Sequence, residues 1–462
     1  MKKKKKLIFK IFSLFTVFLF IVLITVTCVL FFIVPKKSYS VVEKRNLTPF
    51  PEFSFSSLFD GSYTDSITKY VSDNFVFREN LVSLSSEIED LRGIRIDGVK
   101  LYSNNANVIT NTPACIDEPL KQVKESRLGE ETPLFGEEIK ATIDFFKDLK
   151  NIDIYEGLDE SEIIGQQAGP LFLVGKTALE IFYGNSTIAQ DYVNIINNYK
   201  LSIPSEVNVY TMVVPTHIEF GLPEKYKNEV GKPQKPFIDE IYSSLDSSVI
   251  TVDAYSKIQK AYQNNEYLYF RSDHHWTALG AYRAYQAFAE SALFTPTPLT
   301  SFEQRKIDEF LGTFYSSTYD KNLKENPDTV LFYAPKNEYT VTNYRENGID
   351  TYAGTLVYKK VSDISHGYLV FMGGDIPLSV IETDANTGRS LLIFKESYGN
   401  AFVPFLTSNF DKIYVADIRT FPFNAINYVS ENSITDVLFL NNIMTSSSPP
   451  RIRNYLDLMS DN

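Results

Sequence analysis

The hydrophobic positions of the chain form one long run near its start and many short runs later. Residues 11–34 are almost entirely apolar, and about 20 such residues are enough to cross a bilayer as a helix. After residue 166, short apolar runs alternate with segments whose apolar positions recur at helical spacing. Runs that are apolar at successive positions are typical of strands buried on both faces of a sheet. The pattern predicts a membrane-spanning helix followed by an α/β domain.

The short runs locate five strands of that domain. Helical segments separate them, so we expect a parallel sheet with helices on both faces. The predicted strands cover 207–214, 249–253, 391–394, 412–417 and 436–442. A Tyr- and Thr-rich piece at about 313–369 alternates polar and apolar residues, which predicts a small β-rich insertion.

The segments before the domain differ from it in composition. Residues 1–10 form a basic tail, and residues 11–34 form the apolar span. No small-x-small cleavage site follows the span, so we expect an uncleaved signal anchor rather than a cleaved signal peptide. Residues 35–103 indicate a stalk with short helices, and the acidic residues 104–165 indicate an insertion to which no role is assigned. The predicted domain then covers 166–462.

Charge sets the expected orientation and excludes one class of partner. Lysines are concentrated before the apolar span, which places the N-terminus in the cytoplasm and the residues after the span outside the cell. The formal net charge is −12, and the eight lysines of residues 1–40, with no acidic residue among them, leave −20 for the rest. Such a negative domain disfavours nucleic acids and other anionic polymers as partners.

Cysteine usage indicates the kind of cell. Cys28 lies in the span and Cys115 is the only other cysteine, so the exported domain has no pair for an internal disulfide. A large exported domain without disulfides fits a bacterial cell surface, and best that of a Gram-positive cell.

The stretch RSDHHWTALGAY, at 271–282, carries the first candidate chemistry. It holds two of the four histidines and the only tryptophan, and Thr277 is a good N-cap for the helix that follows. If the residues before that helix are extended, Asp273 and His275 share one face and His274 faces away. A carboxylate beside an imidazole fixes its tautomer, so Asp273 with His275 is the preferred base.

Two other interpretations of this stretch stay open. A hydrogen-bonded helix start would use the same polar residues without any catalysis. A divalent-metal site would need several more ligands, and the other histidines, His217 and His366, have no cluster of ligands around them in the sequence. We therefore expect no bound metal.

The second candidate lies at the end of a predicted buried strand. Ser397 follows the strand 391–394 and precedes a helix that begins near Gly399. A serine in this place can act as a nucleophile, with backbone N–H groups at the turn to stabilise an oxyanion. The surrounding residues lack the Gly-x-Ser-x-Gly pattern of ordinary hydrolases, and a serine that only caps the helix is the alternative.

Three stretches taken together carry a resemblance to a known family. DHHW at 273–276, the GAYRAY helix that follows, and KESYGNAFVPFL at 395–406 resemble the DHHW protein family of bacterial surface proteins. That family is similar to the SGNH-hydrolase-like domains of the alginate O-acetylation proteins, which implies a three-layer α/β fold. The resemblance covers most of the chain after the span and includes FLGTFYSS, FMGGDIPL and IYVADIR.

The resemblance also implies roles for single residues. An Asp-x-His-Trp motif matches Asp273, His275 and Trp276, and the family's nucleophile matches Ser397. Glu396 departs from the aspartate that usually precedes this serine. Oxyanion or substrate contacts are expected from Gly373, Gly374, Tyr398, Asn400, Arg419 and Trp276. An arginine that follows a strand can instead pair with an acid at the edge of the core.

These roles imply a membrane-anchored, extracytoplasmic enzyme that O-acetylates a cell-surface polysaccharide or exopolysaccharide. A membrane-bound O-acyltransferase would supply the acetyl groups, and no cofactor is expected. The same mechanism also fits a carbohydrate acetylesterase, in which water replaces the sugar hydroxyl. Two functions outside this mechanism stay open, namely a non-catalytic glycan-binding or assembly protein that retained the fold, and a metal phosphoesterase.

Overall fold

The protein forms two compact units, Met1–Arg92 and Gly93–Asn462. The computed structural model describes residues 2–40, 45–59, 61–78, 80–82, 84, 101–102, 165–168, 171–184, 186–359, 361 and 364–460. The predicted 104–165 insertion lies outside the described residues except for Gly165, and Cys115 lies outside them as well.

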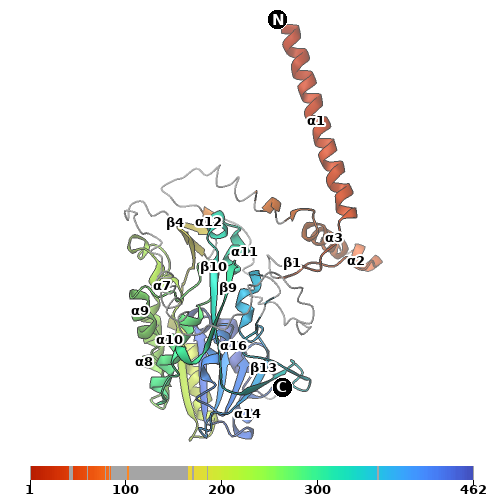
Figure 1. Ribbon diagram of the computed structural model, residues 1–462. Helices are drawn as coiled ribbons and strands as arrows, with labels where there is room; N and C mark the ends of the chain where they lie inside the picture. Colours follow the sequence, from red (N-terminus) through yellow and green to blue (C-terminus); the bar gives the residue numbers. More distant parts are fainter. Residues whose placement is uncertain are drawn as a thin grey trace. The chain divides into compact units, whose positions relative to one another are not determined.

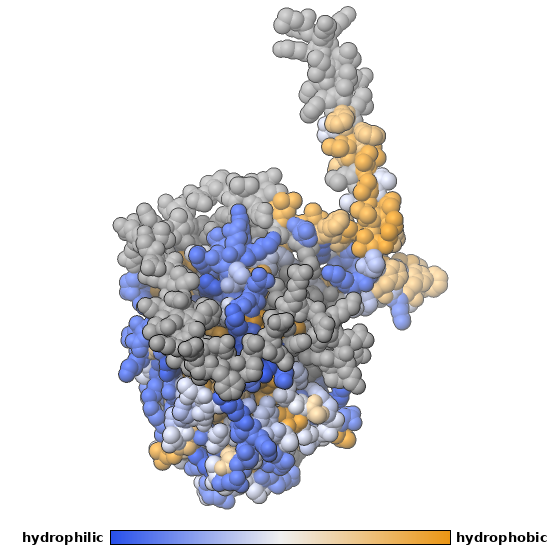
Figure 2. Space-filling view, viewed as in Figure 1, coloured by the Kyte–Doolittle hydropathy of each residue, from blue (hydrophilic) through white to orange (hydrophobic). Residues whose placement is uncertain are grey.

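The first unit begins with one long helix, α1 (Lys2–Ile33). Its segment Phe15–Ile33 is long and apolar enough to cross a membrane, as an anchor or as a signal sequence. Hydrophobic side chains are exposed along this segment and around the short helix α2 (Phe55–Phe59), as Figure 2 shows in orange. The predicted apolar helix is therefore present as a single continuous element.

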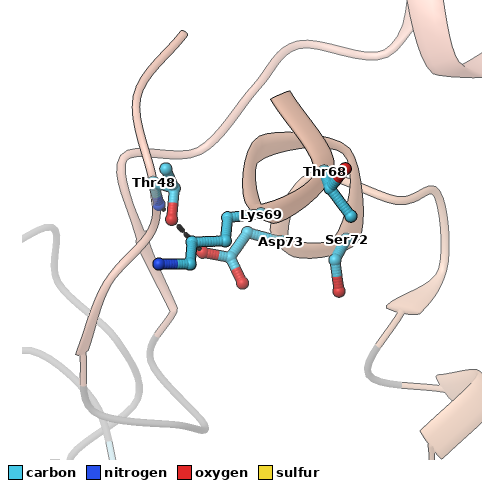
Figure 3. A pocket seen from close by; sticks show the side chains of 5 residues that line it. All are labelled: Thr48, Thr68, Lys69, Ser72 and Asp73. Atoms are coloured by element: carbon cyan, nitrogen blue, oxygen red, sulfur yellow. Dashed lines mark hydrogen bonds between the residues drawn. The ribbon is translucent and has the colours of Figure 1, made fainter. Parts of the chain in front are cut away.

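Helix α3 (Ser62–Asp73) holds the chain that follows α1. Before it, β1 (Tyr39–Ser40) pairs antiparallel with β2 (Arg45–Asn46). The Asp73 carboxylate accepts hydrogen bonds from the backbone N–H and the hydroxyl of Thr48, at 2.9 and 2.7 Å. Thr68, Lys69 and Ser72 complete a shallow pocket around this contact (Figure 3). The pocket pairs no nucleophile with a base, so it is a structural contact between Thr48 and α3.

An eight-stranded mixed sheet forms the centre of the second unit, in the order β12-β11-β13-β15-β14-β16-β7-β8. Its strands are β7 (Asn208–Val214), β8 (Val249–Thr251), β11 (Tyr339–Tyr344), β12 (Thr351–Ala353), β13 (Leu378–Thr383), β14 (Ser390–Lys395), β15 (Lys412–Asp417) and β16 (Asp436–Asn442). Figure 1 shows the yellow-green strand from the middle of the chain among the blue strands of its C-terminal part. The predicted α/β class and all five predicted strands are confirmed.

The sheet differs from the prediction in being only partly parallel. Strands β8, β7, β16, β14 and β15 are parallel, whereas β13, β11 and β12 add to β15 in antiparallel pairs. The short connection between β11 and β12 allows only an antiparallel pair, because a parallel pair needs a long crossover. Two strands of the predicted β-rich insertion thus extend the main sheet instead of forming a separate one.

Side chains on alternate positions of the strands enter two different apolar clusters. In β14, Leu391 and Ile393 join one cluster, while Leu392 and Phe394 join the other. Helices α9 (Ala254–Gln263), α10 (Ala278–Ser291) and α13 (Tyr398–Phe402) contribute to the first cluster. Helices α6 (Ser186–Ser202), α8 (Gln234–Ser244), α14 (Ala425–Glu431) and α16 (Pro449–Asp457) contribute to the second. This packing explains why the strand sequences are apolar at successive positions.

Two smaller sheets and several short helices complete the second unit. One sheet is the hairpin of β9 (Glu303–Phe310) and β10 (Asp328–Ala334). The other contains β3 (Leu101–Tyr102), β4 (Gly165–Ala168), β5 (Leu171–Val174) and β6 (Thr177–Glu180). The short helices are α7 (Ile218–Gly221), η1 (Glu224–Tyr226), η2 (Leu299–Ser301), α11 (Thr313–Thr318), α12 (Lys321–Glu325), η3 (Ile364–Val370), η4 (Val403–Leu406) and α15 (Ile443–Ser446).

A buried carboxylate on β10 fixes the segment that leads into α10. Asp328 is fully buried and accepts hydrogen bonds from the backbone N–H groups of Arg271 and Ser272, at 3.1 and 2.8 Å. The Arg271 guanidinium, the Ser272 hydroxyl and the Tyr267 hydroxyl also donate to it. Five donors on one short segment therefore depend on a single side chain from a distant hairpin.

Replacing Asp328 with alanine should destabilise the protein by about 3 kcal/mol or more, because a largely buried guanidinium and two backbone N–H groups lose their acceptor. Urea unfolding of the purified protein measures this change. The matched control is Asp308→Ala, an exposed carboxylate on β9 of the same hairpin, for which the change should stay within about 0.5 kcal/mol. Equal losses in the two variants would contradict the anchoring role of Asp328.

A second buried group makes stability depend on pH. The His217 ring stacks on Tyr269, with ring centroids 5.2 Å apart and planes 11° apart. Burial lowers the pKa of His217 from its ordinary 6.5 to about 4. Between these two values the unfolded chain binds more protons than the folded one, so stability is complete above about pH 6.5 and falls as the pH drops toward 4.

Replacing His217 with phenylalanine, which keeps an aromatic ring against Tyr269, should remove part of this acid sensitivity. The loss of unfolding free energy between about pH 7.5 and 4.5 should shrink by about 1–3 kcal/mol. Urea unfolding at the two pH values measures the difference. An acid-induced loss of the same size in the variant would show that another group causes it.

Candidate active site

Three side chains from distant parts of the chain form a continuous hydrogen-bonded row. His275 Nδ1 lies 2.6 Å from Asp273 Oδ1, and His275 Nε2 lies 2.8 Å from Ser397 Oγ. The three residues are between 2 and 8% exposed, so the row is shielded from water and still reachable at the serine. The order carboxylate, imidazole, hydroxyl is the arrangement in which a histidine can activate a serine.

The Asp273 carboxylate uses both oxygens. Oδ1 also accepts the backbone N–H of His275 at 3.0 Å, and Oδ2 accepts the N–H and the hydroxyl of Thr313, at 2.7 and 3.1 Å. Gly312 makes this approach possible, because a Cβ at that position would lie 2.1 Å from Asp273 Cβ. The start of α11 therefore clamps the carboxylate from the side opposite His275.

Ser397 stands where β14 ends and α13 begins. Its hydroxyl lies closer to His275 than to the neighbouring Glu396, whose Oε2 is 3.3 Å away. Glu396 accepts the backbone N–H of Tyr398 on Oε2 and that of Asn442 on Oε1, both at 3.0 Å. Burial raises the pKa of Glu396, while these two backbone hydrogen bonds oppose the shift. Glu396 thus ties the serine turn to the end of β16.

Aromatic rings hold the His275 imidazole on both faces. Tyr368 stacks against it with centroids 3.7 Å apart and planes 9° apart, and its hydroxyl donates to the Ser397 backbone oxygen at 3.1 Å. On the other face lies His274, with centroids 3.8 Å apart. The imidazole can therefore rotate little while it keeps its contacts with Asp273 and Ser397.

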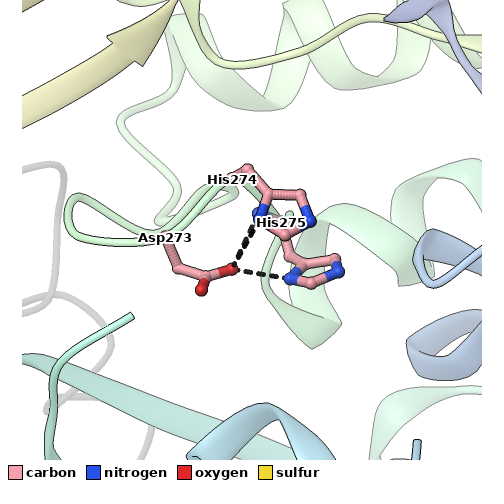
Figure 4. Close-up of side chains that lie close together, drawn as sticks. All are labelled: Asp273, His274 and His275. Atoms are coloured by element: carbon pink, nitrogen blue, oxygen red, sulfur yellow. Dashed lines mark hydrogen bonds and ion pairs between the residues drawn. The ribbon is translucent and has the colours of Figure 1, made fainter. Parts of the chain in front are cut away.

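The position of His274 corrects the prediction that it faces away. Asp273 and His275 do contact each other as expected, but residues 271–275 form a bend rather than an extended strand. The bend brings both imidazoles to the same side of Asp273, as Figure 4 shows. His274 Nδ1 lies 2.7 Å from the Thr313 hydroxyl, so this ring is also fixed by α11.

The group Asp273, His274 and His275 also has the residue types of a metal site, since one ligand atom of each lies within 4.8 Å of the others. Hydrogen bonds already occupy both Asp273 oxygens. Each Nδ1 atom also contacts an oxygen, one on Asp273 and one on Thr313. A metal ligand needs a free lone pair, so these contacts fit a hydrogen-bonded row better than coordination.

Other residues predicted to contact an oxyanion or substrate use their polar groups within the protein. The backbone N–H groups of Gly373 and Gly374 close turns onto Leu369 and Phe371, and that of Tyr398 donates to Glu396. The Trp276 side chain is fully buried, and its indole N–H donates to the Tyr398 backbone oxygen at 3.0 Å. A group already bonded in this way does not present a free donor to a ligand, so these contacts favour a different donor for the oxyanion.

Asn400 and Arg419 belong instead to a buried cluster of charges around Asp375. The Asn400 amide donates to Asp375 at 2.9 Å, and the Arg419 guanidinium contacts Asp375 at 2.6 Å and Asp417 at 2.5 Å. Lys395 lies 3.2 Å from the same carboxylate. Burial opposes ionisation of Asp375, but Arg419 and then Lys395 hold its pKa well below the usual range. Arg419 therefore pairs with acids at the edge of the core, as an arginine that follows a strand often does.

Several residues that fix the row carry no local signal in the sequence. FLGTFYSS contributes to the resemblance, but nothing in it indicates that Gly312 and Thr313 clamp a carboxylate 40 residues earlier. Tyr368 lies in the short, kinked helix η3, and Asp328 begins an ordinary strand. Their roles depend on contacts between segments, which no periodicity or spacing reports.

Comparisons with known proteins agree with the resemblance seen in the sequence. A DHHW family protein from Eubacterium siraeum is 35% identical, over 64% of this chain and 98% of that chain, with a TM-score of 0.60. Bacillus cereus PatB1 with a sulfonyl adduct is 18% identical, over 62% and 98%, with a TM-score of 0.51, which indicates a shared fold. The O-acetyltransferase domain of Pseudomonas putida AlgJ is 14% identical, over 64% and 98%, with a TM-score of 0.36.

No curated protein matches the chain. The family model of the DHHW protein matches residues 140–416, which is more than half of the 462 residues. This match and the DHHW sequence at Asp273–Trp276 show that the chain belongs to the DHHW protein family.

Proposed function

We propose that the protein is an acyl-transfer enzyme with Ser397 as nucleophile, His275 as general base and Asp273 as the group that orients the base. The observation that carries the proposal is the unbroken row from Asp273 Oδ1 through His275 to Ser397 Oγ, with contacts of 2.6 and 2.8 Å. A serine that only caps a helix would place its hydroxyl on a backbone N–H, and the Ser397 side chain makes no such cap.

The reaction would proceed in two halves. His275 Nε2 takes the proton from Ser397 Oγ while this oxygen bonds to the carbonyl carbon of the acyl donor. The proton then passes to the leaving group, whose bond to that carbon breaks, and an acyl-serine remains. In the second half a sugar hydroxyl, or water in an esterase, gives its proton to His275 and takes the acyl group. Asp273 stabilises the imidazolium that forms in each half.

The backbone N–H of Ser397 is the donor best placed for the oxyanion. It makes no hydrogen bond to the part of the chain that the structure describes, whereas the next N–H, of Tyr398, donates to Glu396. An N–H on the nucleophile itself lies close to the carbonyl oxygen that becomes negative during attack. This donor replaces the glycine and asparagine groups that the sequence suggested.

The proposed substrate is an acetyl group, and the proposed acceptor is a cell-surface polysaccharide or exopolysaccharide. Family resemblance supports this choice. The sulfonyl adduct in one structure of PatB1, which shares the fold, supports a reactive nucleophile in such a domain. The basic residues at the start of α1, before its apolar segment, support an extracytoplasmic enzyme with a cytoplasmic N-terminus. A membrane-bound O-acyltransferase would then deliver acetyl groups at the membrane, and no cofactor takes part.

A sulfonyl fluoride should label the purified protein at Ser397, and the same residue should be acetylated by a chromogenic acetyl ester. Ser397→Ala should abolish labelling and lower ester turnover by about 10³-fold or more. His275→Ala should have a similar effect, because the serine loses its base. Peptide mass spectrometry locates the label and absorbance measures turnover.

Ser390→Ala is the matched control, because Ser390 begins β14, the strand that leads to Ser397, and its hydroxyl donates to a backbone oxygen. Labelling and turnover should persist in this variant. A wild-type protein that is inert toward acetyl esters, with and without a sugar acceptor, and that forms no acyl-Ser397 would refute the proposed function.

The contacts of Gly312 and Thr313 with Asp273 should also affect the catalytic rate. Gly312→Ala should lower kcat/KM by about 100-fold, because the added carbon displaces the carboxylate and with it the base. Thr313→Val should lower kcat/KM by about 10-fold, because it removes one of the hydrogen bonds that hold the charged carboxylate. Thr313→Ser keeps the hydroxyl and should restore most of the activity. Equal effects of valine and serine would exclude a role for the hydroxyl.

A further inference from the structure

The tautomer of His274 follows from the hydrogen bonds of its neighbour. The Thr313 hydroxyl has one hydrogen, which it donates to Asp273 Oδ2 at 3.1 Å. Its oxygen must therefore accept the hydrogen of His274 Nδ1, 2.7 Å away. Burial, and then the nearby His275, lower the pKa of His274 to about 4, so the ring is neutral at neutral pH. Its Nε2 atom consequently carries a lone pair.

The Nε2 atom of His274 points in the same direction as the Nε2 atom of His275, the proposed base. Figure 4 shows each ring with one nitrogen toward Asp273 and the other turned away from it on the same side. The outward nitrogen of His275 meets Ser397, and the ring of His274 lies 3.8 Å from that of His275. The His274 side chain is 31% exposed, against 7% for His275. His274 Nε2 makes no hydrogen bond to the described residues.

Glu180 is a second polar group, close enough to His274 to interact with it electrostatically. It is the last residue of β6, a strand that meets the DHHW segment through a hydrogen bond from Ala178 N–H to the Arg271 oxygen, at 3.0 Å. The Glu180 side chain is partly buried and has neither hydrogen bond nor ion pair among the described residues. Burial raises its pKa, His274 lowers it, and nearby carboxylates raise it further. A carboxyl group withdrawn from water in this way gains from a ligand that donates hydrogen bonds.

We infer that His274 and Glu180 form an acceptor subsite beside Ser397 that recognises a neutral sugar by a hydroxyl next to the one that reacts. The inference rests on the proposed acyl-transfer function and names the class of its acceptor. Both groups accept hydrogen bonds, so they select hydroxyl donors, and the adjacent acids disfavour anionic sugars. His274 is therefore a positioning residue for the acceptor.

In the second half-reaction, His275 transfers the proton and His274 binds the acceptor. The reacting hydroxyl gives its proton to His275 Nε2 while its oxygen bonds to the acyl carbon. The bond from that carbon to Ser397 Oγ breaks, and the proton passes from His275 to the serine. Meanwhile the neighbouring hydroxyl of the same sugar donates to His274 Nε2. A monohydric alcohol can make the first contact but not the second.

The test compares two acceptors that compete for one acyl-enzyme. The purified full-length protein is acetylated with p-nitrophenyl acetate in the presence of equal amounts of methyl glucoside and ethanol, and mass spectrometry gives the ratio of the two esters. Because both products come from the same acyl-enzyme, its rate of formation cancels from the ratio. The wild type should favour the glucoside.

His274→Asn keeps a polar group at the position of Nδ1, where it can bond Thr313, but has none at the position of Nε2. The ratio of glucoside ester to ethyl ester should therefore fall about 3- to 10-fold, which is the effect of one hydrogen bond. His274→Gln, whose amide reaches the Nε2 position, should recover part of the preference. Glu180→Gln, which alters the second group without changing its size, should also lower the ratio. Thermal unfolding confirms that each variant is folded.

An unchanged ratio in a folded His274→Asn variant would overturn the inference. If that variant does not fold, an unchanged ratio in Glu180→Gln overturns it instead. A wild type that forms acyl-Ser397 but shows no preference for the glucoside refutes the subsite and leaves the proposed function standing. A wild type that forms no acyl-serine refutes the proposed function and the subsite together.

Discussion

The rest of the site depends on the hydrogen bonds that the two Asp273 carboxylate oxygens accept. Oδ1 fixes His275 directly, and Oδ2 is held by Thr313, which in turn fixes His274. A buried carboxylate is stable only when donors surround it, and here the bend and the start of α11 provide them. The charge that orients the proposed base therefore also orders the loop around it.

This constraint explains why the site needs segments from so many places. The bend at 271–275 is not stabilised by the regular backbone hydrogen bonds of a helix or a strand. Its N–H groups therefore need acceptors from side chains. Asp328 on β10 supplies acceptors for its start, and the fully buried Trp276 anchors its end against Tyr398. Gly312 lets α11 approach without a side chain between them. Each partner is a common residue type, and it stabilises the bend only because the fold places it beside the bend.

The serine is positioned by a different device, the parallel part of the sheet. Ser397 follows β14, which lies between β15 and β16, so the turn forms at the carboxyl ends of neighbouring strands. Ligand sites of open α/β sheets occur at such ends. Glu396 bonds this turn to β16, and the Asp375 cluster, with Lys395 and Arg419, secures its other side. The antiparallel strands β13, β11 and β12, which extend the sheet beyond β15, widen it without changing this arrangement.

Local patterns in the amino-acid sequence were enough to locate the main elements and the proposed row. Apolar runs identified α1 and the strands β7, β8, β14, β15 and β16, because burial imposes a period on each element. The strand end at Ser397 and the pairing of Asp273 with His275 followed from residue type and short spacing. Three features became visible only in the folded chain: His274 turns to the same side, β11 and β12 extend the main sheet, and distant residues support the row or the segment that carries it. These residues are Gly312, Thr313, Asp328, Tyr368 and Glu180. These features depend on which distant segments meet, and a pattern within one segment carries no information about its partner.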